Sequence, residues 1–250
     1  MTPPETIFNI FPVWIGTYLS TAIFFGISAC IFYRSSLRLI LLGQKSNLLD
    51  HKLERSTGII KPVFGQSKVL QSFSIKTDLA GLAHFFTFWG FLSFALSYVL
   101  FIFGDSIWHR FSETILTDKG VQVFASYLDV LAITFLLVIL IGIGRRWWKT
   151  PRRLSFDLTQ KIDAAIILAF ISMLMILTIL TEAFYVAGNG EGPHAEALIG
   201  KAIGKAFMSS NLSESAALIL HEVGWWLHLL VILSFSIVIP LSKHTHLIGA

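Results

Sequence analysis

Histidines inside apolar segments are the residues of this sequence whose types and spacing favour chemistry. His228 and His246 enclose the stretch HLLVILSFSIVIPLSKHTH, and His84 lies in GLAHFFTFWGF. Their spacing of 18 residues completes five helical turns, so His228 and His246 leave the same face of one helix, about 27 Å apart. Two neutral imidazoles facing each other across a helix bundle are the usual axial ligands of low-spin b-type haem. We interpret the histidines as candidate haem ligands, the alternative being hydrogen bonds to neighbouring helices.

The elements that must position these histidines are apolar helices. Hydrophobic residues make up 54% of the chain and charged residues only 14%, a composition that excludes an ordinary soluble domain. Five apolar runs are each long enough to cross a hydrocarbon core of about 30 Å, and none alternates as a barrel strand would. We therefore expect an all-α membrane protein, a five-transmembrane-helix bundle that forms one domain over residues 1–250. The expected helices cover about residues 13–33, 79–103, 121–143, 162–186 and 216–241.

The distribution of positive charge predicts how the bundle is oriented. Eight Lys or Arg residues lie between residues 34 and 76 and six between residues 145 and 161, whereas the other two loops hold two each. Cytoplasmic loops retain positive charge, so we expect the N-terminus outside and the C-terminus in the cytoplasm. The net charge of +4 then follows from topology and lipid headgroups, without a nucleic-acid partner. The predicted location is the cytoplasmic (inner) membrane, crossed several times.

The connections and the single cysteine add further expectations. Residues 44–78 are expected to form a polar cytoplasmic connection, and a short surface helix is expected outside at about residues 195–207. Cys30, the one cysteine, lies in the first apolar run. It is interpreted as a packing residue, because an iron–sulfur cluster needs several thiolates.

His84 and His246 form the predicted pair at the inner surface. His84 lies just inside the cytoplasmic end of the second expected helix and His246 at the cytoplasmic end of the fifth, so the two can hold one haem iron, as a metal-ligating pair. His228 lies nearer the outer surface and cannot serve the same iron, since it is separated from His246 by most of the helix. His244 points roughly 160° away from His228, which disfavours it as a ligand.

Three acidic residues inside the spans are candidates for a proton or quinone role. Asp129, Glu182 and Glu222 all fall toward the outer half of the expected bundle. Ionisable groups are costly in lipid and therefore count as functional candidates. A quinone site needs only an apolar cleft and a few hydrogen-bonding groups near it. The alternative for each acid is helix capping or pairing with external bases.

Two segments carry a resemblance to a known family. LHLLVILSFSIVIPLSKHTHLIGA resembles the last helix of the nitrate reductase gamma-subunit family of membrane cytochromes b, in which two histidines eighteen residues apart bind different haems. GQSKVLQSFSIKTDLAGLAHFFTFWGF is similar to the second helix and its lead-in in one branch of that family. This branch comprises the membrane-anchored iron–sulfur oxidoreductases related to heterodisulfide reductase. The resemblance implies that His84 and His246 hold the haem nearest the cytoplasm and that His228 belongs to a second haem. Phe94 stands where two-haem members have the partner histidine, so one haem b is expected and two are the alternative.

The resemblance also implies a place in a respiratory chain. Electrons would pass in either direction between a cytoplasmic iron–sulfur protein or domain and a membrane quinone. An electron-transfer flavoprotein or dehydrogenase is the further partner considered. The clusters would lie in a separate polypeptide or in a further part of a longer chain. Two other functions remain open from the residues themselves: a proton-conducting transporter subunit and a haem-free membrane anchor of a cytoplasmic enzyme. Both predict a protein without pigment, so an absorption spectrum separates them from a cytochrome.

Overall fold

The computed structural model describes residues 3–7, 10–43, 51–71, 80–108, 110–148, 158–190 and 197–242. Within these ranges, five helical segments are long and apolar enough to cross a membrane, which confirms an all-α bundle of five such helices and supports a multi-pass membrane protein. The orientation of the termini stays a prediction. The long helices are α1 (Val13–Phe32), α5 (Ala80–Ser97), α7 (Phe111–Ile143), α8 (Leu158–Asn189) and α10 (Glu214–Val238).

Shorter elements extend or connect the long helices. A two-stranded antiparallel hairpin precedes α1, and π-helical turns prolong α1, α5 and α7 at their C-terminal ends. The short helices are α2 (Arg38–Leu41), α3 (Lys52–Val63), α4 (Ser67–Leu70), α6 (Asp105–Ile107) and α9 (Leu198–Ser209). The remaining elements are β1 (Thr6–Ile7), β2 (Phe11–Pro12), η1 (Tyr33–Leu37), η2 (Tyr98–Gly104), η3 (Gly144–Trp148) and η5 (Ile239–Leu241).

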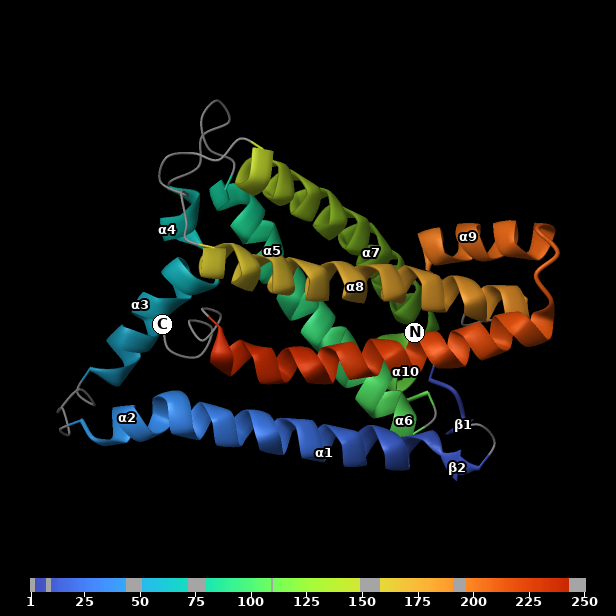
Figure 1. Ribbon diagram of the computed structural model, residues 1–250, viewed down its shortest axis with the longest axis horizontal. Coiled ribbons are helices and arrows are strands. Elements are labelled where there is room, and N and C mark those ends of the chain that lie inside the picture. Colours follow the sequence, from blue (N-terminus) through green and yellow to red (C-terminus); the bar gives the residue numbers. More distant parts are fainter. Residues whose placement is uncertain are drawn as a thin grey trace.

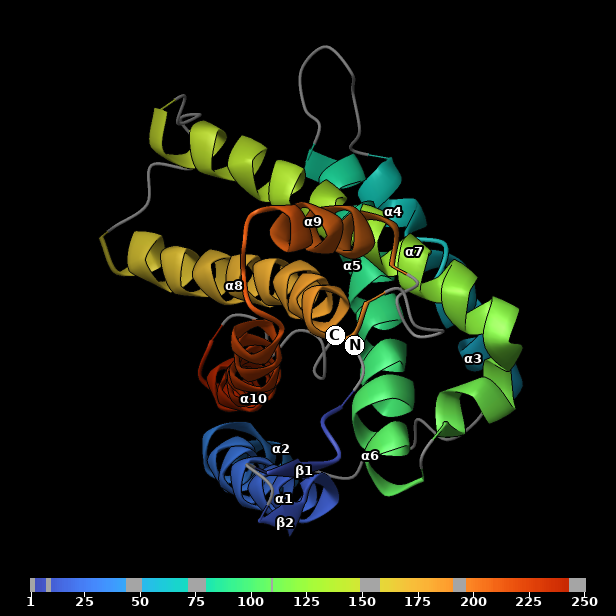
Figure 2. The same cartoon turned by 90° about the vertical axis from the view of Figure 1, so that its right-hand side faces the viewer.

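Helix α10 lies between α8 and α1, and these three run side by side (Figures 1 and 2). Helices α10 and α8 pack closely at Gly224, where an added Cβ atom would lie 2.8 Å from Oγ1 of Thr181 of α8. Helix α7 covers another side of α8, while α5 crosses the bundle steeply and contacts α7. Helix α1 is hydrophobic all round and buries only Val13 and Thr17. Most of its other apolar side chains are exposed, as expected for a helix in lipid, while Phe24 packs against the core.

Helix α9 packs on the surface of α8 through a pair of glycines. Gly200 and Gly204 are four residues apart, so they lie on one face of α9, and both are buried. Cβ atoms added at these positions would lie within 3 Å of α8 atoms. The absence of side chains at the two glycines thus lets the helix backbones approach closely. The expected surface helix at residues 195–207 is present, shifted to Leu198–Ser209.

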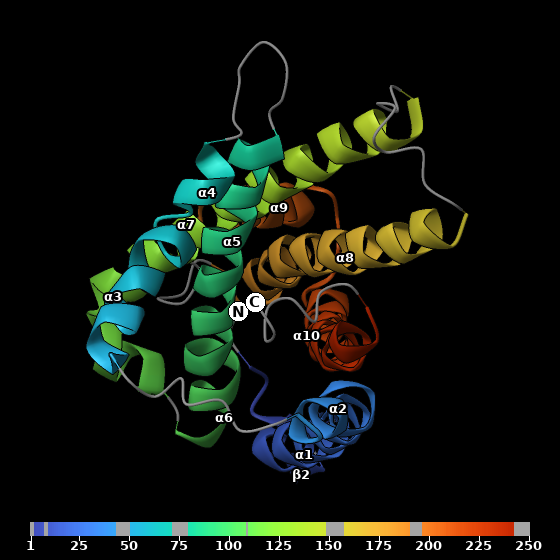
Figure 3. The same cartoon turned by 90° about the vertical axis from the view of Figure 1, so that its left-hand side faces the viewer.

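The connection at residues 44–78 contains helices that the sequence analysis did not predict. Helices α3 and α4 lie in its described part, and Figure 3 shows them at the end of the bundle where α5 begins. Gly58 and Pro62 fall within α3, and both residue types normally indicate a break in a helix. Pro62 has no N–H group, so it removes one backbone hydrogen bond close to the C-terminal end of α3.

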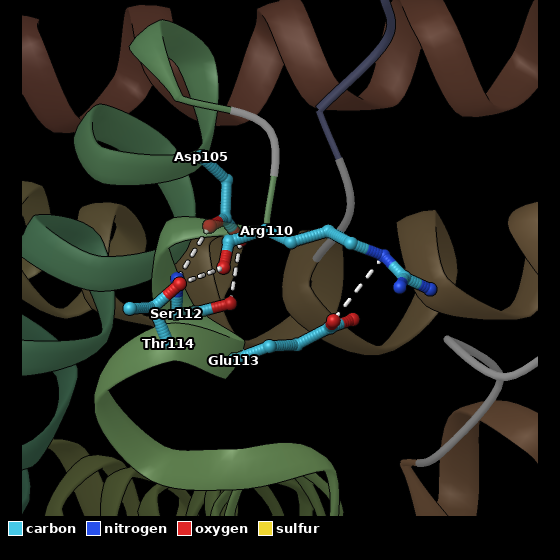
Figure 4. A network of polar contacts seen from close by, with 5 residues as sticks. All are labelled: Asp105, Arg110, Ser112, Glu113 and Thr114. Atoms are coloured by element: carbon cyan, nitrogen blue, oxygen red, sulfur yellow. Dashed lines mark hydrogen bonds and ion pairs between the residues drawn. The ribbon is translucent and has the colours of Figure 1, made fainter.

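Helix α7 begins ten residues before the predicted start at residue 121. Its N-terminus is capped by Asp105, whose two carboxylate oxygens accept from the backbone nitrogen and the hydroxyl of Ser112, both at 2.8 Å. Arg110 adopts a left-handed conformation with φ of 67° and pairs with Glu113 at 3.2 Å (Figure 4). A kink follows at Thr117. This first part of α7 is too polar for a hydropathy run, so the sequence placed the helix start too late.

Candidate functional site

His84 lies in the first turns of α5, and its imidazole contacts the loop between α3 and α4. The Nδ1 atom of His84 is 3.2 Å from Oε1 of Gln66. The amide nitrogen of Gln66 donates to the Val63 carbonyl oxygen at 2.6 Å, which fixes the orientation of the amide. The amide oxygen therefore faces His84.

This contact determines which nitrogen of His84 carries the proton. An amide oxygen only accepts hydrogen bonds, so this contact requires a proton on Nδ1 of His84. A histidine that donates from one ring nitrogen and presents a lone pair on the other has the form of a metal ligand. The chemistry of His84 therefore fits axial ligation of a haem iron. Its predicted partner His246, and His244 beside it, lie outside the described residues, so their pairing stays a prediction.

His228 lies in the middle of α10 and is completely buried, with 0% of its surface exposed. Neither of its ring nitrogens has a hydrogen-bond partner among the described residues. Leaving a buried polar group unsatisfied costs about 1–3 kcal/mol. An imidazole with no described partner inside the bundle has the donor chemistry of a metal ligand, and ligation by His228 stays a prediction.

The space that faces His228 is filled by aromatic rings. The Tyr98 ring meets His228 edge to face, with centroids 5.7 Å apart and an interplanar angle of 72°. Phe94 follows at 6.4 Å from Tyr98, and Phe135 of α7 lies 5.9 Å from Phe94. A cavity of about 30 Å³ borders Tyr98 and Phe94, far below the roughly 300–1,000 Å³ of small-molecule pockets. This cavity is too small to hold a porphyrin.

The contact between Tyr98 and His228 also shows how far apart His84 and His228 lie along the bundle. His228 contacts Tyr98, which lies fourteen residues after His84 on the same continuous helix. At 1.5 Å per residue, this separation is about 21 Å along the axis. His84 and His228 thus belong to different levels of the bundle. Phe94 lies one helical turn before Tyr98, and their rings are 6.4 Å apart.

Asp129 caps a helix that belongs to another part of the chain. Its side chain, 1% exposed, projects from α7 to the N-terminus of α9, where Oδ2 accepts from the backbone nitrogens of Ile199 and Gly200 at 2.7 and 2.9 Å. Helix N-termini carry unpaired N–H groups and a partial positive charge, so an acceptor there is stabilising. The capping alternative thus accounts for Asp129 without a proton role.

The other polar residues of the outer half also contact neighbouring helices. Glu182 of α8 is buried, and its aliphatic part packs against Gly200 of α9. Nδ1 of His221 lies 3.0 Å from the Thr181 carbonyl oxygen of α8, so His221 joins α10 to α8. Glu222 is partly buried in α10. Among the described residues, no group of three or more His, Cys, Asp or Glu side chains forms a metal site.

Sequence reasoning missed two residues that the structure places at the histidines. Gln66 comes from the connection that was expected to be a polar loop, and Tyr98 was taken as part of an apolar helix. A signal existed for Tyr98, because it lies one helical turn after Phe94 and so shares its face. No sequence periodicity connects Gln66 with His84, since the contact depends on how α3 and α4 fold back on α5.

Comparisons with known proteins give two relatives. The chain is 30% identical over 216 residues to a Bacillus subtilis protein described as "Probable iron-sulfur-binding oxidoreductase FadF", covering 86% of this chain and 29% of that protein. It is 26% identical over 201 residues to the EtfAB:quinone oxidoreductase of Syntrophomonas wolfei, covering 75% of this chain and 26% of that protein. The chain therefore spans less than a third of the length of either relative.

No family profile and no solved structure matches the chain. The names of the two relatives support a redox function related to iron–sulfur and quinone-linked electron transfer. They agree with the iron–sulfur branch of the resemblance. The wider likeness to the nitrate reductase gamma subunits stays a prediction.

Proposed function

We propose that this chain is the haem b-bearing membrane part of a quinone-linked oxidoreductase. It passes electrons between a cytoplasmic iron–sulfur protein or domain and the membrane quinone pool, with an electron-transfer flavoprotein or a dehydrogenase as the soluble partner. The observation that carries the proposal is the hydrogen bond from Nδ1 of His84 to Gln66, which places the proton as in a histidine that ligates a metal through its other nitrogen. The relatives support the redox class, since one is described as iron–sulfur-binding and the other as a quinone oxidoreductase.

In this proposal, His84 and His246 hold the iron from α5 and from the C-terminal end of the chain. One-electron transfer is the chemistry that a haem supplies when bound. In the chain as described, His84 is exposed on α5. It would bind the iron through Nε2, and Gln66 would keep Nδ1 protonated. The predicted orientation places this end of the bundle at the cytoplasmic surface, next to the proposed iron–sulfur partner.

We propose one haem in each chain rather than two. His228 has the chemistry of a second ligand, but the Tyr98 ring occupies the space against it and Phe94 offers no nitrogen on the opposing helix. Extraction of haem from purified protein of known mass measures this count. One haem per chain is the expected result, and two would show that Tyr98 moves aside and that another ligand replaces Phe94.

The test of the proposal is the absorption spectrum of the purified chain. We expect a low-spin b-type spectrum that His84→Ala and His246→Ala remove, while His244→Ala serves as the matched control and keeps most of it. An absent spectrum in the unmodified chain would favour the haem-free anchor or the proton-conducting subunit. A spectrum unchanged by His84→Ala would contradict the pairing while leaving haem binding itself in place.

A further inference from the structure

Gln66 differs from its surroundings in burial and in backbone conformation. It is only 5% exposed, whereas most of α3 and the residues around its end are exposed. Its φ of 49° lies in the left-handed region, which non-glycine residues seldom adopt. This conformation turns the side chain away from solvent, between the last turn of α3 and the first turns of α5.

The two ends of the Gln66 amide perform different tasks. The nitrogen is held by the carbonyl oxygen of Val63 at the C-terminal end of α3, and the oxygen is thereby presented to Nδ1 of His84. A carbonyl near the end of a helix has no partner within the helix and is available for such a bond. The amide thus connects the loop between α3 and α4 to one face of α5.

We propose that Gln66 is a positioning residue that orients His84 and tunes the haem iron it ligates. This inference rests on the haem function proposed above. Through its contact with Nδ1, Gln66 limits the rotation of the His84 ring and keeps the proton on Nδ1, which assigns iron ligation to Nε2. The hydrogen bond on Nδ1 also makes the imidazole a stronger electron donor, as second-shell acceptors of ligating histidines do.

A more basic axial ligand stabilises the oxidised iron relative to the reduced iron. Second-shell hydrogen bonding is one of the ways in which a protein sets a haem potential. Removal of the Gln66 oxygen is therefore expected to raise the midpoint potential of the inner haem. A side chain with a purely structural role would alter the amount of folded protein and leave the potential of the remaining haem unchanged.

The experiment is a redox titration of the b-type spectrum in membranes that contain the full chain. Gln66→Met keeps the length of the side chain and removes both polar atoms. Gln66→Asn keeps the amide and suits the left-handed conformation, but is one methylene too short to reach His84. Gln71→Met is the matched control, because Gln71 is exposed at the end of the same short helix α4. A tag on the chain reports the amount of protein, so that haem is counted per folded chain.

We expect a higher midpoint potential, or a lower haem content at unchanged protein level, in both Gln66 variants and neither change in Gln71→Met. If Gln66→Met does not accumulate, Gln66→Asn gives the same measurement. An unchanged potential and haem content in a Gln66 variant would overturn the positioning role, while the proposed haem function would stand. A chain without a b-type spectrum would overturn both.

Discussion

Asp129 offers the sharpest separation of a structural role from a proton-transfer role. Its Oδ2 atom accepts both hydrogen bonds from the N-terminus of α9. Asp129→Asn keeps one carbonyl oxygen, which can accept the same two bonds, but cannot carry or release a proton. Asp129→Ala removes the acceptor altogether. The two variants therefore behave alike if Asp129 transfers protons and differently if it caps α9.

The expected magnitude follows from the two hydrogen bonds. Each hydrogen bond contributes about 1.5 kcal/mol, which is the top of the range for bonds between neutral groups and the bottom of the range for bonds to charged groups. Losing both bonds in Asp129→Ala therefore destabilises the docked α9 by roughly 3 kcal/mol. Since about 1.4 kcal/mol corresponds to a factor of ten, the open state of α9 should become roughly 100-fold more populated. Asp129→Asn loses only the charge at the helix N-terminus, about 1 kcal/mol or less, and should change the population by less than tenfold.

Hydrogen exchange measured by mass spectrometry on peptides covering residues 197–209 reports this opening. Asp118→Ala is the matched control, because Asp118 is exposed on the same helix α7 and should leave α9 protected. The rate at which a quinone analogue reoxidises the reduced chain is measured in parallel. If Asp129→Asn slows reoxidation more than tenfold while α9 keeps its protection, the capping account is insufficient and the acid acts on protons.

Three further predictions concern packing, capping and orientation. Gly204→Ala places a methyl group 2.7 Å from a backbone oxygen of α8. We therefore expect the exchange protection of α9 to fall by about 1–3 kcal/mol. Gly26→Ala is the control and should have little effect, because no described atom lies within 4 Å of the new carbon. Asp105→Ala removes the cap of α7 and should cost about 1–2 kcal/mol, seen as faster exchange in the first turn of α7. After replacement of Cys30 by serine, Ser56→Cys on α3 should react with an impermeant thiol reagent only after cell lysis, and labelling in intact cells would reverse the predicted orientation.

The five long helices could be predicted from the sequence because each buries its own backbone polar groups and needs only length and hydropathy to be recognised. The residues at which these helices begin and end could not be predicted in the same way. Helix α7 starts at Phe111 because a side chain from the preceding turn caps it, and such a cap lies outside any hydropathy window. Helix α3 was missed for a related reason, since its sequence KLERSTGIIKPV contains no long apolar run.

The candidate site was predictable only in part. The choice of His84 and His228 came from their residue type and apolar surroundings, and the structure gives each a distinct environment. His84 has a polar partner in Gln66, whereas His228 has an aromatic neighbour and no hydrogen-bond partner among the described residues. These neighbours come from helices distant in sequence, so no pattern within one helix reveals them.

The satisfaction of hydrogen bonds is what distinguishes the ionisable residues of the spans from one another. Asp129 and His221 meet the needs of backbone groups on neighbouring helices, and their burial is explained by the packing they stabilise. For His228 no described group plays that part, so a leucine at the same position would avoid the cost of about 1–3 kcal/mol of an unsatisfied polar group. The rule that an ionisable residue in a membrane span marks function therefore applies with unequal force within one bundle. The rule is a weak indicator of function where a helix terminus or a carbonyl oxygen is the partner of the ionisable residue. It is the strongest indicator at His228, whose ring nitrogens have no hydrogen-bond partner among the described residues.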